Sequence, residues 1–254
     1  MAESADVKKS QPKNLDFVRL SGDTWQALEE FDERIRQYHL SLKDPSLDYF
    51  KEAIRLLHEI IRGIVEPTSE WHPRFKTGSK VAQVLLLSAA GSLRSLLASY
   101  KLLIAGYFME AHVSIRMVEQ WLELSVIVEA NPSLANKVLE EGVQGAHLKG
   151  ARRKSPELDK LLGAMGKTFH ELSQRGHVTK TAIRLVTQST GHDTMKLVPA
   201  AIRSSEMLGR DSLALAGMTM NVIRLLKRHF KTVPLQWNSR LVLNNKLITE
   251  RKRP

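Results

Sequence analysis

Two long apolar segments meet at Gly106 and restrict the fold more than any other feature of the chain. The first runs from residue 78 or 79 to Ile104 and the second from about Tyr107 to Ala130, and both repeat apolar side chains at helical spacing. Because the connection is so short, the two helices are predicted to pack antiparallel. The small residues 89–92 would let another backbone approach closely. The predicted inward residues are Leu86, Ala89, Ala90, Leu93, Leu97 and Ile104, then Val113, Met117, Trp121, Leu124 and Val128.

Helix-start signals divide the rest of the chain into further helices. A side-chain oxygen just before a helix accepts from free backbone N–H groups, and proline fits the first helical position. Such signals predict helices over residues 24–42, 45–65, 132–141, 156–173 and 199–230. Residues 180–187 favour a short strand and residues 188–194 a turn. The predicted fold class is therefore all-α, an up-and-down antiparallel helical bundle.

The chain is predicted to contain four portions. Residues 1–20 are expected to form a disordered polar tail, and residues 21–78 an N-terminal helical extension. The bundle itself is predicted over residues 79–232. Residues 233–254 are predicted to form a basic tail or a short helix.

Cysteine is absent, which excludes disulfides, thiolate metal sites and a cysteine nucleophile. A cytoplasmic location fits this composition best. Residues 81–106 are long enough to span a membrane, but the span would have to bury Arg94 and Lys101. No membrane association is therefore expected.

Positive charge is concentrated in the C-terminal half of the chain. The net charge of +11 divides into −2 for residues 1–130, with 16 basic and 18 acidic residues, and +13 for residues 131–254, with 22 and 9. A nucleic acid would be attracted to the basic half by a sequence-independent, salt-sensitive force. The alternative is a basic surface that is merely solvated.

Two short motifs resemble the HEPN-like superfamily, in particular a bacterial family of uncharacterised or abortive-infection-associated helical proteins. One is the stretch GYFMEAHVSIRMVEQWLEL at residues 106–124, with Arg116 and Glu119, and the other is His170-Glu171-Leu172-Ser173 followed by His177. The resemblance covers about residues 80–230. It implies an up-and-down helical bundle that is frequently a homodimer and, for many relatives, a metal-independent endoribonuclease activity at the dimer cleft. No cofactor is predicted.

The resemblance also implies candidate catalytic residues. Active relatives carry an arginine followed four to six residues later by a histidine, which stabilise phosphate charge and take part in proton transfer. Two pairs fit, Arg34 with His39 and Arg224 with His229, and roughly two are expected by chance. Arg224 and His229 lie in the basic half and are the candidates. Alternatively, they are a basic helix end that complements the helix dipole.

Arg116, Glu119 and His177 are the candidate ligand-binding residues. Arg116 and Glu119 lie on neighbouring turns of one predicted helix, and the family pattern suggests His177 as the third member. Arginine there could hold a phosphate or a carboxylate. A purely structural ion pair is the alternative.

No metal site is predicted. His192-Asp193 resembles the metal-binding pair of HD phosphohydrolases, but it lies in a predicted turn where Asp193 can cap a helix. His58 and His112 are expected to be packing or surface residues. Three functions stay open. The first is a binding or regulatory module that contacts a polyanion or a protein partner, for which the resemblance suggests a defence or mobile-element setting. The others are a metal-independent endoribonuclease and a small-ligand-binding protein with a site centred on Arg116.

Overall fold

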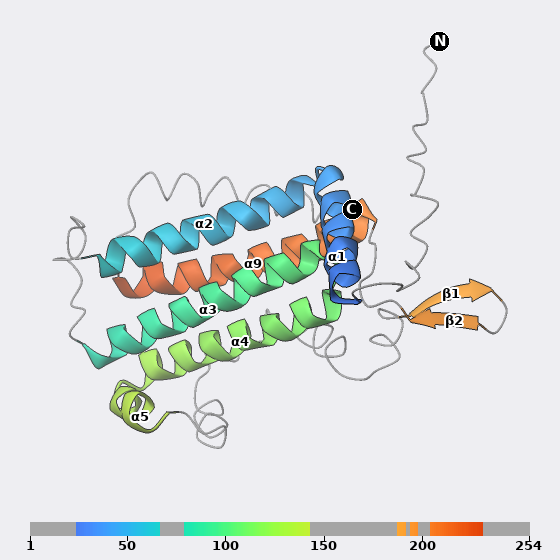
Figure 1. Ribbon diagram of the computed structural model, residues 1–254. Helices are drawn as coiled ribbons and strands as arrows, with labels where there is room; N and C mark the ends of the chain where they lie inside the picture. Colours follow the sequence, from blue (N-terminus) through green and yellow to red (C-terminus); the bar gives the residue numbers. More distant parts are fainter. Residues whose placement is uncertain (1–23, 67–78, 143–186, 192–193, 198–203, 231–254) are drawn as a thin grey trace, which may run out of the picture.

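The computed structural model describes residues 24–66, 79–142, 187–191, 194–197 and 204–230. These residues form a helical bundle with one small β-hairpin (Figure 1). The all-α prediction is therefore confirmed for the bundle. The elements are α1 (Thr24–Ser41), α2 (Pro45–Val65), α3 (Lys80–Ile104), α4 (Phe108–Ala130), α5 (Leu134–Glu141), β1 (Thr187–Gly191), β2 (Thr194–Leu197) and α9 (Ser205–Phe230).

The starts predicted for α2 and α3 are reproduced because short-range hydrogen bonds fix them, whereas α5 and α9 begin at Leu134 and Ser205 rather than at the predicted residues 132 and 199. The Ser46 N–H donates to Asp44 Oδ1 at 2.8 Å at the start of α2, and the Ala82 N–H donates to Ser79 Oγ at 3.0 Å at the start of α3. Gly106 has φ 86°, and the next N–H, on Tyr107, donates to the Leu102 carbonyl at 2.8 Å. This is the glycine-ended helix terminus expected at the turn between α3 and α4.

Helices α3 and α4 form the predicted antiparallel pair. Ser99 Oγ donates to the Ala111 carbonyl near the turn, at 3.1 Å. Further from the turn, the indole of Trp121 lies directly over Gly91, where an added Cβ would come within 2.4 Å of the ring. The close approach expected at residues 89–92 is thus made by a side chain of α4.

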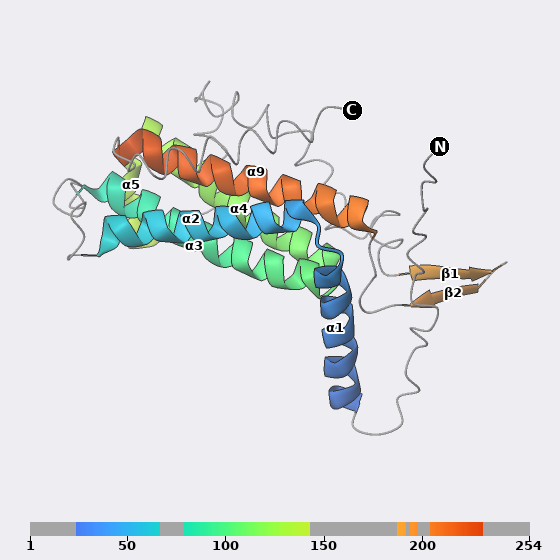
Figure 2. The ribbon, with the colours of Figure 1, turned by 90° about the horizontal axis from the view of Figure 1, so that it is seen from above.

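One core joins α2, α3, α4 and α9. Figures 1 and 2 show that α2, α4 and α9 run in the same direction and α3 in the opposite one. Phe50, Leu56 and Leu57 of α2 are fully buried in this core. The boundary predicted at residue 78 therefore does not separate two packing units, because α2 supplies part of the bundle's interior.

The inward face was predicted wrongly at three positions. Leu97, Val113 and Met117 are between 42% and 49% exposed. The buried residues are their neighbours, such as Leu96 on α3 and Ile115 on α4. Leu124 and Val128 are buried as predicted, but in a second small cluster with Val84 and Ala135. Because α4 is apolar on more than one side, periodicity alone could not select the side that faces the core.

Helix α1 extends away from the bundle and is attached at the α3–α4 turn (Figure 2). Tyr107 Oη donates to Asp32 Oδ1 at 2.7 Å. The His39 ring is fully buried, and its Nδ1 lies 2.8 Å from the Ile104 carbonyl. Of the predicted N-terminal extension, α1 is the described part that stands outside the bundle.

The β-hairpin replaces a predicted turn. Strands β1 and β2 pair antiparallel, with Thr187 opposite Leu197 and an irregular register between Ser189 and Gly191. Residues 188–191 therefore form a strand, because they pair with β2 rather than turn locally. The strand predicted over 180–186, the helix predicted over 156–173 and both terminal portions lie outside the described residues.

Among the described helices, α3 alone is long and apolar enough to cross a membrane by length and composition. In the structure it packs in the main core against α2, α4 and α9, and it also contacts α5 and α1. The core helix of a bundle passes the same test, so the observation does not by itself place α3 in a membrane.

Candidate functional site

The exposed side of α9 carries a row of arginines. The inner side is apolar as predicted, with Leu208, Leu215, Met218, Val222 and Leu225 all buried. Arg210, Arg224 and Arg228 are exposed, and their spacing of 14 and 4 residues places them along one stripe of the helix. The stripe is roughly 27 Å long at 1.5 Å per residue. We call these three residues the arginine stripe.

Small and neutral residues lie between the ends of the arginine stripe. An added Cβ at Gly217 would meet no atom within 4 Å, so the helix backbone is accessible there. Asn221 accepts a hydrogen bond from Arg224 Nη1 at 2.8 Å. The arginine stripe is therefore a shallow surface with cationic ends, and Glu206 is the exposed acidic residue at its beginning.

The structure gives Arg224 and His229 different partners. Arg224 bonds to Asn221 on its own helix, whereas His229 faces Glu129 on α4, with 3.7 Å between His229 Nδ1 and Glu129 Oε1. No direct contact joins the two candidate catalytic side chains within the described part of one chain. Arg228, the residue before His229, also pairs with Glu129.

Glu129, Arg228 and His229 form a polar group where α4 and α9 end. His229 is 23% exposed, and its ring meets that of Phe230 edge-on at a centroid distance of 4.9 Å. Burial lowers the pKa of His229 below its ordinary value, although the Glu129 carboxylate acts in the opposite direction. A neutral imidazole beside a carboxylate and an arginine can accept a proton.

Arg116 and Glu119 lie three residues apart on α4 but differ in exposure. Arg116 is exposed, whereas Glu119 is only 5% exposed. Burial raises the pKa of Glu119 to about 7, with the charge of Arg116 opposing this shift and that of Glu123 adding to it. The two groups interact electrostatically, with the Glu119 carboxyl buried and the Arg116 side chain exposed. His177, their proposed third member, lies outside the described residues.

A buried pair in the interior was not foreseen. His112 on α4 and Asp211 on α9 are 2% and 8% exposed, and His112 Nε2 lies 3.6 Å from Asp211 Oδ1. Within the described chain, both ring nitrogens of His112 lack a hydrogen-bond partner. His112 and Asp211 are 99 positions apart in the chain, so no local signal allowed the pair to be inferred.

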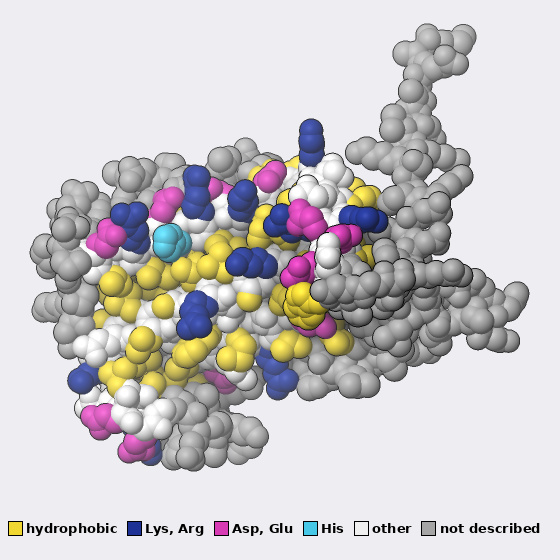
Figure 3. Space-filling view, viewed as in Figure 1, with side chains coloured by type: hydrophobic (Ala, Val, Ile, Leu, Met, Phe, Trp, Pro, Cys, Tyr) yellow, Lys and Arg dark blue, Asp and Glu magenta, His cyan; other side chains and the backbone are white. Residues whose placement is uncertain are grey.

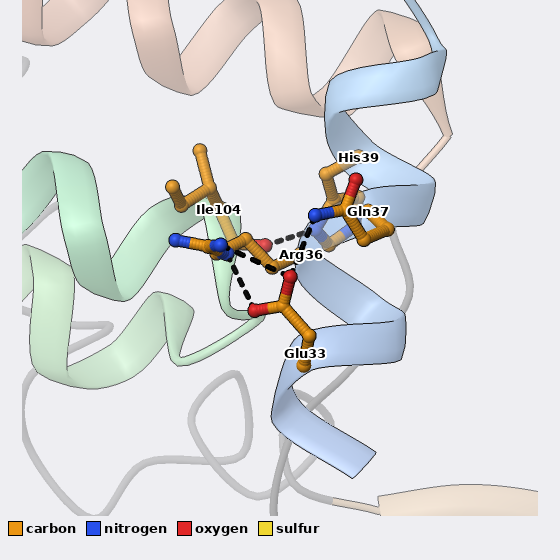
Figure 4. A network of polar contacts seen from close by, with 5 residues as sticks. All are labelled: Glu33, Arg36, Gln37, His39 and Ile104. Carbon is orange, nitrogen blue, oxygen red and sulfur yellow. Dashed lines mark hydrogen bonds and ion pairs between the residues drawn. The ribbon is translucent and has the colours of Figure 1, made fainter. Parts of the chain in front are cut away.

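The second arginine–histidine pair has a structural explanation. Arg34 is exposed, whereas His39 faces the last carbonyl of α3, that of Ile104 (Figure 4). That carbonyl has no partner within its own helix, so a ring N–H can satisfy it. Glu33, Arg36 and Gln37 form a separate surface network nearby, with 2.8 Å between Arg36 Nε and Glu33 Oε2.

Over the described ranges, no three histidine or acidic side chains lie close enough together to hold a metal ion. His192 and Asp193, the dipeptide that resembles an HD pair, lie outside those ranges.

Comparison with known proteins found no matching family model, no matching curated protein and no matching solved structure. The HEPN-like resemblance therefore rests on the two sequence motifs.

Proposed function

We propose that the protein is a HEPN-like helical module that binds a polyanion, RNA or DNA, through the arginine stripe of α9. The observation that carries the proposal is the exposure of Arg210, Arg224 and Arg228 along one side of a helix whose other side is core. Guanidinium groups bind phosphate oxygens well. The net charge of +13 over residues 131–254 supports the same surface. A homodimer and a defence or mobile-element setting are proposed from the motif resemblance alone.

Salt dependence tests this proposal. Affinity for a labelled single-stranded RNA should fall steeply as salt is raised, because binding releases counterions. In the double variant Arg210→Ala and Arg224→Ala, affinity should fall, and the slope of log affinity against log salt should become less steep by about 1.4, or about 0.7 per lost phosphate contact.

Arg55→Ala with Arg62→Ala is the matched control. These α2 residues are 66% and 63% exposed, so the control removes the same charge from another surface. Equal weakening by both double variants would contradict a specific role of the arginine stripe. If wild-type protein binds neither RNA nor DNA at low salt, the polyanion proposal fails and a protein partner becomes the alternative.

A metal-independent endoribonuclease is the second candidate. The group formed by Glu129, Arg228 and His229 favours it, because it holds a partly exposed imidazole beside an arginine. Labelled RNA should be cleaved in the presence of a chelator, and His229→Ala should abolish cleavage. His58→Ala, which changes an exposed histidine of α2, should have no effect.

The pH profile gives the endoribonuclease candidate a second test. If neutral His229 is the base, the rate should fall only below about pH 6.5, because burial lowers the pKa of the imidazole. Cleavage that persists in His229→Ala, or that requires a divalent metal, would exclude this mechanism.

A further inference from the structure

An apolar surface lies on the outer side of α3 and α4, away from the arginine stripe. Leu87 and Leu97 of α3 and Val113 and Met117 of α4 are between 42% and 57% exposed. The Ser99–Ala111 and Gly91–Trp121 contacts place the two helices side by side over this length. Figure 3 shows the hydrophobic side chains gathered along both helices on one face. We call this surface the α3–α4 face.

Basic side chains lie among the apolar ones. Arg94 and Lys101 of α3 and Arg116 of α4 are all exposed, and α3 contains no acidic residue. Glu110, near the turn, is the one acidic residue of the two helices that is exposed rather than partly or fully buried. The α3–α4 face therefore offers apolar and cationic groups together, with little negative charge.

We propose that the α3–α4 face docks on the surface of an anionic lipid bilayer. Such a surface provides phosphate and carboxylate headgroups for the arginines and hydrocarbon for the leucine, valine and methionine side chains. The half-buried ring of Trp121 lies between the two helices, and tryptophan favours the headgroup region. Both helices lie flat on the membrane, so Arg94 and Arg116 stay at headgroup level and no charge is buried.

Two other occupants fit this face less well. A second copy placed on a two-fold axis through the centre of the face would set Arg94 and Arg116 against the same arginines, and like charges oppose association. A nucleic acid would cover four exposed apolar side chains with phosphates, which offer them no apolar contact. Neither arrangement satisfies both kinds of side chain.

Flotation of the full-length protein with vesicles tests the proposal. The protein should float with vesicles of phosphatidylcholine and phosphatidylserine and much less with phosphatidylcholine alone. Leu97→Asp and Met117→Asp should each lower the bound fraction at least about tenfold, since each puts a carboxylate into the contact.

Leu40→Asp and Met207→Asp are matched controls. They change the same residue types at similar exposure, 39% and 46%, on α1 and α9. Both should leave flotation unchanged, as should the RNA-binding variant Arg210→Ala with Arg224→Ala, so this proposal can fail independently of the proposed function. Failure of the wild-type protein to float, or equal flotation of Met117→Asp, would overturn it.

Measurement of the oligomeric state in solution tests whether a second copy occupies the α3–α4 face instead of a membrane. A wild-type dimer that Leu97→Asp converts to a monomer would assign the α3–α4 face to a second copy and overturn the membrane proposal. Capture of an acidic protein through this face, without vesicle binding, would overturn it as well.

Discussion

Glu119 is a carboxyl group that the fold takes out of water. It lies seven residues after His112, on the same side of α4, where the helix faces the interior. Burial raises its pKa from 4.5 to about 7 because the charged form loses its hydration. The Glu119 carboxyl therefore changes charge near neutral pH.

This shift predicts a pH-dependent stability. A carboxyl whose pKa is higher in the folded state stabilises the fold at low pH and loses that contribution as pH rises to 7 and above. The glutamine of Glu119→Gln stays neutral at every pH. The free energy of unfolding of this variant should therefore exceed that of wild type by less than about 1 kcal/mol at about pH 5 and by about 3 kcal/mol at about pH 8.

Urea unfolding at the two pH values measures this difference. Glu110→Gln, an exposed change on the same helix, should show no comparable dependence on pH. If Glu119→Gln and wild type differ by the same amount at both values, the carboxyl does not titrate as described.

At the scale of the elements, the contact between α3 and α4 depends on one missing side chain. Gly91 accommodates the Trp121 indole, and an added Cβ would lie 2.4 Å from Trp121 Cε2. The indole is rigid and packed between two helices, so one of them would have to move. At Gly217 of α9, by contrast, an added Cβ would have no other atom within 4 Å.

The two glycines therefore predict opposite effects of the same substitution. Gly91→Ala should lower the free energy of unfolding by about 1–3 kcal/mol, because overpacking outweighs the better helix propensity of alanine. Gly217→Ala should raise it by about 0.5–1 kcal/mol, since only the propensity changes. Thermal unfolding of both variants under the same conditions decides the matter, and a stabilising Gly91→Ala would show that Trp121 moves away freely.

Capped helix starts were predictable, whereas the starts of α5 and α9 and the buried faces of the helices were predicted only in part. The capping oxygens of Asp44 and Ser79 act within three residues, so their effect can be deduced from the chain. The inner side of α9 was also predictable because its apolar stripe is narrow. For α4 it was not, since Ile115 and Val113 are equally apolar and packing alone decides that Ile115 is buried.

At the scale of the whole molecule, contacts between distant segments determine the architecture. The Asp44 carboxylate begins α2 and also accepts from Ser205 Oγ at 2.8 Å, which ties the start of α2 to the start of α9. Gly209 allows this, because a Cβ there would lie 2.9 Å from Asp44 Oδ2. The parallel arrangement of α2 and α9 thus rests on residues 161 positions apart.

Some features of the candidate sites can be deduced from the sequence, whereas others depend on how the helices pack. The basic character of the C-terminal half follows from composition, and the exposure of Arg210, Arg224 and Arg228 follows from the apolar stripe on the other side of α9. The partner of His229 cannot be deduced from the sequence, because the parallel packing of α4 and α9 brings Glu129 to it. The same packing of α4 against α9 places His112 beside Asp211.

By itself, the sequence determined the helical class, the capped starts of α2 and α3 and the antiparallel α3–α4 pair, since these depend on propensity, capping and short connections. Tertiary structure alone decided that α2 belongs to the core, that Leu97, Val113 and Met117 face outward, and that Glu119 is buried. Those outcomes depend on which of several apolar surfaces meet, and such a choice is a property of the whole packed chain.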